Sequence, residues 1–458
     1  MKSAKVIGIG ALALFAVNVA FATNWNQDVP LGAAWSDTNN WVQGHAPGTN
    51  DSAIFVTSQA NTLDVDVDVA SKPLVLIQVG EEYTFNGTGS LAIRRELVPG
   101  NNYIMYNTTA GGTVAYNVPL GISTYTTDGI NRLGQPNNSN GGTTIFNDTF
   151  TLEPDAWVNW VGGTYEFNGD LDLQGNTFRV GTAKVVIGGS GTTTMAMNYF
   201  LLPDPAGELH LARENAYVPP ATGFLRVEKG KVFLDAPNAL APDVKIRMYQ
   251  TDPGSALVSG GDYDQNLGVF YVQGGVPYPV IIDMQNTACM WTFVDCSHIG
   301  WDPKGLDINN VDTSNTVIRF KMEGVPGTGL TETQISRTRI NGQQLTIADT
   351  TIIGGYLYIT PATEVPTPDI IAPSIVGSSL VPGNAIKIVV DAPSAAGRYW
   401  PEGKLDLVSG SWTNIAHSDD GVNAFVVTNL DYSTAEGTNK VIYVEASAAK
   451  EFFRINGE

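Results

Sequence analysis

From about residue 60 to residue 360, apolar and polar residues alternate in short runs. Examples are "TYEFNGD" (164–170), "LDLQGN" (171–176), "TFRVGT" (177–182) and "AKVVIGG" (183–189). Alternation with a period of two is typical of strands with one buried face. The runs stop at Gly, Asn or Asp, residues that accept the positive φ of tight turns. We find no segment with helical periodicity after the first 22 residues, so the chain is predicted to be all-β.

Two all-β architectures fit such a pattern. Separate sandwiches would show domain-sized blocks divided by linkers. Here the strands recur roughly every 6–10 residues, and no Pro-rich linker interrupts the chain between Leu63 and Ile359. This favours a right-handed β-solenoid (parallel β-helix) over residues 23–360, in which each coil stacks on the previous one. At roughly 20–30 residues per coil, it would contain about 10–15 coils.

The pattern breaks at "TPATEVPTPDIIAPS", where four prolines fall between residues 361 and 373. Proline removes backbone donors from a sheet and stiffens the chain, as in a linker. Residues 361–374 are therefore predicted to be a linker. Residues 375–458 read as about seven short strands, among them "AIKIVV", "KLDLVS", "AFVVTNL" and "VIYVEAS". This suits a small β-sandwich of immunoglobulin or fibronectin type.

The first 22 residues have the composition of an export signal. Lys2 and Lys5 precede an apolar run, and Ala20-Phe21-Ala22 fits a small-x-small cleavage site. A retained membrane anchor is the alternative, but the run of about 15 residues is shorter than the roughly 20 that cross a bilayer. We expect cleavage after Ala22, a secreted or cell-surface protein, and no membrane-spanning segment in the mature chain.

The stretch "WSDTNNWVQGHAPGTNDSAIF" (35–55) is dense in tryptophan, glycine and proline. A stacked β-coil has an open edge that would recruit other chains unless it is covered. Trp25, Trp35, Trp41 and Phe55 are predicted to be the apolar side of such a cap, over about residues 23–56, because tryptophans bury large areas. The alternative is an aromatic platform that binds sugars.

The same stretch carries a resemblance to a protein family. It resembles the "W…NW..G..P…D.A.F" opening of secreted bacterial autotransporter-like β-helix proteins, through Trp35, Asn40, Trp41, Gly44, Pro47, Asp51, Ala53 and Phe55. "FNGDLDLQGNTFRVGTAKVVIGGSG" and "GFLRVEKGKVFLDAPNALAPDVKIRM" are similar to the rungs of that group, and "GRYWPEGKLDLVSGSWTNI" is similar to a small sandwich module at the end of such proteins. The resemblance implies a surface, adhesive or structural role without a conserved active site.

The chain is acidic, and this excludes some partners. It has 45 Asp and Glu against 25 Lys and Arg, a net charge of −20. Loss of Lys2 and Lys5 with the signal would bring the charge to about −22. Nucleic acids and anionic membranes require a cationic face, so neither is an expected partner. The charge also weighs against polyanionic sugars.

Two groups of carboxylates are candidate calcium ligands. In "LDVDVDVA", Asp64, Asp66 and Asp68 would share one strand face at a spacing of about 6.7 Å, with the intervening valines Val65, Val67 and Val69 in the core. Ca²⁺ takes six to eight oxygen ligands. In "GGDYDQNLG", Asp262 and Asp264 alternate like the start of a calcium loop, but no acidic residue closes it. For the first group, the alternative is a solvated acidic face.

The two cysteines, Cys289 and Cys296, occur in "CMWTFVDC". In an exported chain, a local disulfide is the leading interpretation. A spacing of seven along a straight strand would place the thiols on opposite faces, so the bond requires a bend. Two free buried thiols are the alternative. A metal cluster that adds His298 is a weaker hypothesis.

We find no catalytic motif. His45, His210, His298 and His417 are scattered, and neither Gly-x-Ser-x-Gly nor His-Glu-x-x-His occurs. A catalytic pair of carboxylates for glycoside hydrolysis remains an open alternative, since the chain contains many Asp and Glu residues. The sequence therefore favours an exported structural or adhesive protein that self-associates or binds cell-surface glycans. The alternative is a carbohydrate-binding or carbohydrate-active protein, with lyase-like or hydrolase-like chemistry.

Overall fold

The structure is a computed structural model that divides into two compact units, Met1–Thr363 and Glu364–Glu458. It describes residues 22–25, 30–49, 51–56, 63–73, 76–79, 82–96, 103–107, 111–125, 134–138, 140–153, 156, 158–194, 200–202, 204–217, 224–273, 277–323, 327–360, 374–381, 385–391, 399–404, 413–414, 417–418, 434–436, 439–445 and 452–457. Residues 1–21 of the predicted signal and residues 361–373 of the predicted linker lie outside this set. The boundary between the units falls within that linker.

The first unit is built around one 14-stranded sheet. Its strands, in sheet order, are β2 (Ala33–Ala34), β4 (Leu63–Asp66), β7 (Tyr83–Asn86), β10 (Thr113–Tyr116), β13 (Thr143–Phe146), β16 (Thr164–Phe167), β19 (Lys184–Ile187), β22 (Glu208–Leu211), β24 (Lys231–Leu234), β26 (Ala256–Ser259), β29 (Val280–Asp283), β31 (Leu306–Asn309), β33 (Thr338–Ile340) and β34 (Gln343–Gln344). Every pair except the last, β33 with β34, is parallel.

Four further sheets belong to the same unit. The first contains β1 (Ala22–Asn24), β3 (Ser52–Val56), β6 (Leu76–Val79), β9 (Tyr103–Asn107) and β12 (Gln135–Asn138). The second contains β20 (Thr193–Thr194), β17 (Leu171–Asp172), β14 (Phe150–Leu152), β11 (Leu120–Tyr125), β8 (Ser90–Glu96) and β5 (Ala70–Ser71). The third contains β15 (Val158–Trp160), β18 (Phe178–Val180), β21 (Phe200–Leu202), β23 (Phe224–Val227), β25 (Lys245–Met248) and β28 (Phe270–Val272). The fourth contains β27 (Gln265–Leu267), β30 (Met290–Phe293), β32 (Val317–Lys321), β36 (Tyr356–Tyr358) and β35 (Thr351–Ile353).

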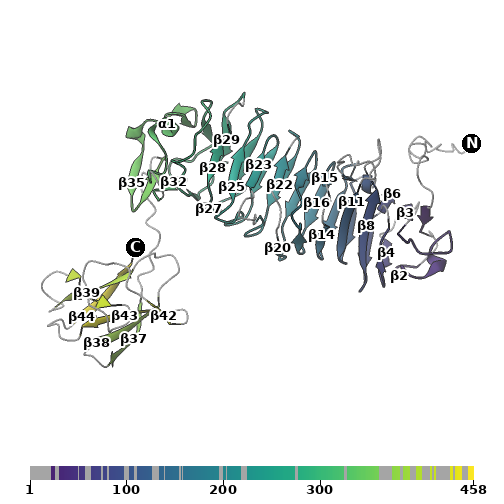
Figure 1. The fold of residues 1–458 in the computed structure, drawn as a ribbon, viewed down its shortest axis with the longest axis horizontal. Coiled ribbons are helices and arrows are strands. Elements are labelled where there is room, and N and C mark those ends of the chain that lie inside the picture. Colours follow the sequence, from purple (N-terminus) through teal and green to yellow (C-terminus); the bar gives the residue numbers. More distant parts are fainter. Residues whose placement is uncertain are drawn as a thin grey trace, which may run out of the picture. The chain divides into compact units, whose positions relative to one another are not determined.

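Strands that follow each other in the chain mostly lie in different sheets, and strands paired within a sheet come from later passages of the chain. Figure 1 shows the result as a row of strands lying side by side along the first unit. The all-β prediction is confirmed, and the large parallel sheets are compatible with a parallel β-helix. The four runs of alternation between 164 and 189 form β16, β17, β18 and β19.

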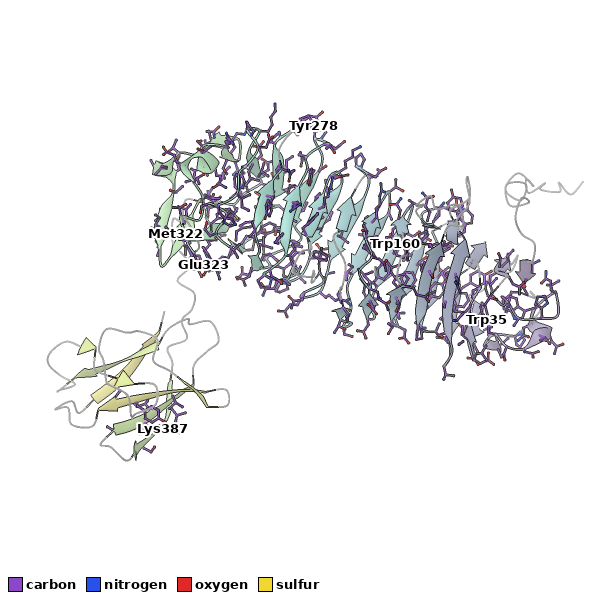
Figure 2. All side chains as sticks on the ribbon, viewed as in Figure 1. Trp35, Trp160, Tyr278, Met322, Glu323 and Lys387 are labelled. Carbon is purple, nitrogen blue, oxygen red and sulfur yellow. The ribbon has the colours of Figure 1, made fainter. Side chains whose placement is uncertain are left out.

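The core contains a column of stacked aromatic rings. Phe85, Tyr116, Phe146 and Phe167 occupy paired positions of β7, β10, β13 and β16, with successive ring centroids 4.8, 5.6 and 4.8 Å apart. Trp160 packs beside this column and is fully buried. Figure 2 shows Trp160 within the strand stack and Trp35 near its N-terminal end. The alternation of the sequence thus places one face of each strand in a continuous core.

The four aromatic residues of the predicted N-terminal cap pack against one another. Trp25, Trp35, Trp41 and Phe55 are all buried. The Trp41 ring lies edge-on to Trp25 at 4.9 Å and to Trp35 at 5.0 Å, and its indole nitrogen donates to the Trp35 carbonyl at 2.8 Å. The short 3₁₀ helix η2 (Thr38–Asn40) turns the chain between Trp35 and Trp41. Because these rings are buried, they are not a platform for sugars.

At the C-terminal end of the first unit, the strand pairing changes from parallel to antiparallel. Helix α1 (Glu332–Ile335) begins with a capping box between Thr331 and Gln334, and the 3₁₀ helix η3 (Ile347–Asp349) precedes β35. Strand β36 pairs antiparallel with both β32 and β35, and β34 folds back on β33. The strand row therefore ends in two hairpin-like edges.

The second unit contains two antiparallel sheets. One orders β37 (Ser374–Val381), β38 (Ala385–Asp391), β43 (Asn439–Glu445) and β41 (His417–Ser418), with β42 (Thr434–Glu436) also on β43. The other orders β40 (Thr413–Asn414), β39 (Tyr399–Lys404) and β44 (Phe452–Gly457). The predicted strands "AIKIVV" and "VIYVEAS" correspond to β38 and β43. Ile388, Val441 and Val444 are buried.

Candidate functional site

Among the described residues, the two ends of the first unit carry most of its exposed large apolar side chains. At the N-terminal end, Leu31 is 62% exposed and Val42 is 65% exposed. Leu31 lies two residues before β2, the first strand of the 14-stranded sheet, and the Val42 nitrogen donates to the Asn24 carbonyl of β1, the first strand of its own sheet. The cap thus buries its tryptophans but leaves two aliphatic side chains in solvent.

At the C-terminal end, three isoleucines are exposed. Ile347 belongs to η3, and Ile352 (63% exposed) and Ile353 (42% exposed) belong to β35. β35 is the last strand of its sheet, so its outer edge has no strand partner within the described residues. An exposed apolar edge strand is a template for pairing with another chain. The sequence feature that indicates this exposed edge is the break in alternation at "TTIIGG", where two isoleucines are adjacent.

The three aspartates of the first carboxylate group do not converge into a metal-binding cluster in the described structure. Asp64, Asp66 and Asp68 are partly exposed beside buried Val65 and Val67, as the alternation predicted. The prediction for Val69 was wrong, because β4 ends at Asp66 and Val69 is 40% exposed. No cluster of three or more His, Cys, Asp or Glu suited to a metal occurs among the described residues, which include all three aspartates.

Asp68 instead connects the segment that follows β4 to Ser36, which follows β2. Its carboxylate accepts hydrogen bonds from the backbone nitrogen of Ser36, at 2.9 Å, and from the Ser36 hydroxyl. Burial acts to raise the pKa of Asp68, but the bonds from Ser36 outweigh it and leave that pKa below its usual value. The carboxylate is thereby committed to a structural contact.

The second carboxylate group also bonds to backbone. Oδ1 of Asp262 accepts from the Ala288 nitrogen at 2.7 Å, and Oδ1 of Asp264 accepts from the Met290 nitrogen at 2.7 Å. Both donors lie 26 residues later in the chain: Met290 is the first residue of β30, and Ala288 precedes that strand by two residues. These aspartates were predicted as calcium ligands because they alternate. They serve instead as acceptors that align one passage of the chain with the next.

The predicted disulfide is absent, and both cysteines are free and buried. Strand β30 separates them, and each thiol has its own partners: Cys289 Sγ lies 3.3 Å from Thr287 Oγ1, and Cys296 Sγ accepts from the Phe270 nitrogen at 3.3 Å. Burial raises the pKa of Cys289 and raises that of Cys296 to about 12. His298 is exposed, and the described residues hold no metal cluster that includes it.

One histidine lies in a polar cluster on the outer face of the 14-stranded sheet. His210 Nδ1 lies 2.6 Å from Asp235 Oδ2, its Nε2 lies 3.4 Å from Glu208 Oε2, and its ring stacks on Phe233 with centroids 4.2 Å apart. Hydroxyl or thiol nucleophiles are not among these contacts. The cluster connects the neighbouring strands β22 and β24, because His210 of β22 contacts Phe233 of β24 and Asp235 directly after that strand.

Comparison of the chain with protein-family models, curated proteins and solved structures finds no match. Within the described part of the chain, no helix has the length and apolar character needed to span a bilayer.

Proposed function

We propose that this is an exported structural or adhesive protein of the cell surface. In this proposal, residues 23–360 form a right-handed β-solenoid of the autotransporter-like kind, followed by an immunoglobulin-like or fibronectin-like sandwich. Copies associate end to end through their solenoids. The parallel sheets and the aromatic cap support the architecture, and the resemblance of residues 35–55 supports the family.

The observation that carries end-to-end association is the exposure of apolar side chains at both ends of the strand row. Leu31 and Val42 at one end, and Ile347, Ile352 and Ile353 at the other, are the exposed surfaces that a second copy could cover. Within the described part of the chain, five of the seven exposed large hydrophobic residues belong to these two places. A contact between two different ends is heterologous and does not close, so it builds linear assemblies.

Charge sets the conditions for assembly. A net charge of −20 opposes close approach of copies, and salt screens that repulsion. Because the described residues hold no metal cluster, calcium enters this proposal only as an ordinary cation. Sodium and calcium chloride at equal ionic strength should therefore promote association to the same degree.

The test is the oligomeric state of the mature full chain, measured by light scattering over a range of concentrations and salt. Val42→Glu and Ile352→Glu should each suppress assembly, because each places a charge in the contact. Tyr278→Glu is the matched control, since Tyr278 is exposed but lies in a turn before β29. An equal mixture of the two end variants should recover dimers through their intact ends.

Two results would contradict the proposal. One is a monomer at all salt concentrations. The other is turnover of a glycan in a polysaccharide degradation panel run on the same samples, which would favour the carbohydrate-active alternative. Export is tested separately by N-terminal sequencing of the protein recovered outside the cells, which should begin at Thr23.

A further inference from the structure

One outward face of the first unit concentrates positive charge in this acidic chain. Arg226 of β23 and Arg247 of β25 are paired residues on adjacent parallel strands, and Tyr271 of β28 follows in the same register column. Arg179 of β18 lies two strands earlier in that column, with Leu201 at the position between. The residues on either side of each arginine are buried, so all three arginines project from the same face.

Aromatic rings interleave with these arginines. The Arg226 guanidinium carbon lies 4.1 Å from the centroid of the Tyr249 ring, and that of Arg247 lies 4.0 Å from the Phe224 ring and 5.2 Å from the Tyr271 ring. We name the set Arg179, Arg226, Arg247, Phe224, Tyr249 and Tyr271 the arginine–aromatic strip. These contacts restrain the Arg226 and Arg247 guanidinium groups on the outer face.

The charges of the strip are incompletely balanced by the protein. Glu228 pairs with Arg226, but no carboxylate pairs with Arg179 or Arg247 within the described residues. The Nε atoms of all three arginines are buried without a hydrogen-bond partner in the described structure. Like charges at directly paired strand positions destabilise a sheet. An anion bound along the strip would relieve the repulsion between Arg226 and Arg247.

We propose that the arginine–aromatic strip binds carboxylate-bearing polysaccharide chains. Arginine holds a carboxylate by two parallel hydrogen bonds, and the half-buried rings of Phe224, Tyr249 and Tyr271 offer contacts to the apolar faces of sugar rings. Adjacent strands are about 4.8 Å apart, so Arg226 and Arg247 are separated by about the spacing of successive acidic groups in an extended chain that carries one per sugar. Arg179 lies two strands from Arg226 and would meet an acidic group further along the same chain. The site is separate from the ends of the stack and independent of end-to-end association.

The net charge of the chain weighs against polyanionic sugars as partners. That prediction averages over the whole surface, whereas screening in salt confines each charge to a range of about 8–10 Å. A short cationic strip can therefore hold a polyanion locally. Nucleic acid is the less suitable polyanion, because its affinity comes from neutralising many closely spaced phosphates, and the chain as a whole is acidic.

The test is binding of the mature full chain to immobilised polygalacturonate and alginate, with neutral dextran and single-stranded DNA as comparisons. Arg226→Gln and Arg247→Gln should each weaken binding to the acidic glycans at least tenfold, because each variant removes a charge-assisted pair with a carboxylate. Arg247→Lys should also weaken binding, because it keeps the charge but loses the planar fork. Glu228→Gln should tighten binding by freeing Arg226 from its internal partner.

Arg339→Gln is the matched control. Arg339 projects from the 14-stranded sheet and is already paired with Asp307 at 2.6 Å, so its loss should leave glycan binding unchanged. The light-scattering behaviour of the strip variants should equal that of the unmodified protein, which separates this proposal from end-to-end assembly. Unchanged glycan binding by the double variant R226Q/R247Q, equal binding of dextran, or tighter binding of single-stranded DNA would each overturn it.

Discussion

Asn117 and Asn147 are 30 residues apart in the chain, yet Nδ2 of Asn147 donates to Oδ1 of Asn117 at 2.8 Å. The relationship repeats on both sides. Asn117 donates to Asn86 at 2.7 Å, and Asn168 donates to Asn147 at 3.0 Å. Each asparagine lies at or directly after the end of a strand of the 14-stranded sheet, next to the stacked aromatic column. The four side chains thus bond four successive strands to one another at their C-terminal ends.

Asn117→Ala removes two of these side-chain bonds. A net contribution of about 0.5–1.5 kcal/mol per bond predicts a loss of about 1–3 kcal/mol in the free energy of unfolding, toward the lower value because these bonds are exposed. Urea unfolding followed by circular dichroism measures it. Asn168→Ala removes one bond of the same kind and should cost about half as much. Equal losses for the two variants would show that the ladder does not act as a chain of bonds.

The cap gives a second prediction. Trp41→Ala should lower the free energy of unfolding by about 3–5 kcal/mol, because it opens a cavity between Trp25, Trp35 and Phe55. Trp41→Phe keeps a ring but loses the bond to the Trp35 carbonyl, so its loss should be smaller. Exposed Val42→Ser is the control and should change stability little. A Trp41→Ala protein as stable as the parent would contradict the capping role.

The fold could be predicted from sequence where a strand is recognisable by itself. "TYEF" places Tyr165 and Phe167 inside because alternation within one strand determines which residues are buried. The cap could be predicted because four large rings lie close together in the sequence, between Trp25 and Phe55. Both features are local, so neither required knowledge of which strands pair.

The candidate sites depend on the register between successive passages of the chain, and the sequence does not specify it. Arg226 and Arg247 are paired positions only because β23 and β25 align in register. Asp262 was predicted to be a calcium ligand from its alternation with Asp264. Its actual hydrogen-bond donor, the backbone nitrogen of Ala288, lies 26 residues later in the chain and could not be identified from that local pattern. The irregular spacing of the strands prevented phasing. The sequence therefore could not predict which residues of successive strands are paired, or which backbone donor binds each carboxylate.

The cysteines give a third prediction, about reactivity. Cys289 and Cys296 should stay reduced in the purified protein, and neither should react with iodoacetamide at about pH 8 while the protein is folded. Burial limits access, and the raised pKa values keep both thiols protonated at that pH. Both should react after unfolding in urea. Mass spectrometry without reduction measures both points, and a mass lower by two hydrogens would show that the disulfide forms after all.

The last prediction concerns acid. Asp170 Oδ1 accepts hydrogen bonds from the Thr192 nitrogen at 2.7 Å and from its hydroxyl at 2.8 Å, and these bonds lower the pKa of Asp170 below its usual value. A carboxyl whose pKa is lower in the folded state stabilises the protein above the unfolded pKa of about 3.9, and that stabilisation is lost as pH falls through the folded pKa.

Asp170→Asn should therefore be less stable than the parent at about pH 7, and the difference in melting temperature should shrink steadily as pH falls below about 4. Thr192→Val removes only the hydroxyl bond and should give a smaller difference with the same pH dependence. Melting temperatures measured between about pH 2.5 and pH 7 provide the comparison. A difference that stays constant across this range would mean that the substitution disturbs packing, and that the charge-assisted bonds from Thr192 to Asp170 contribute nothing to folding.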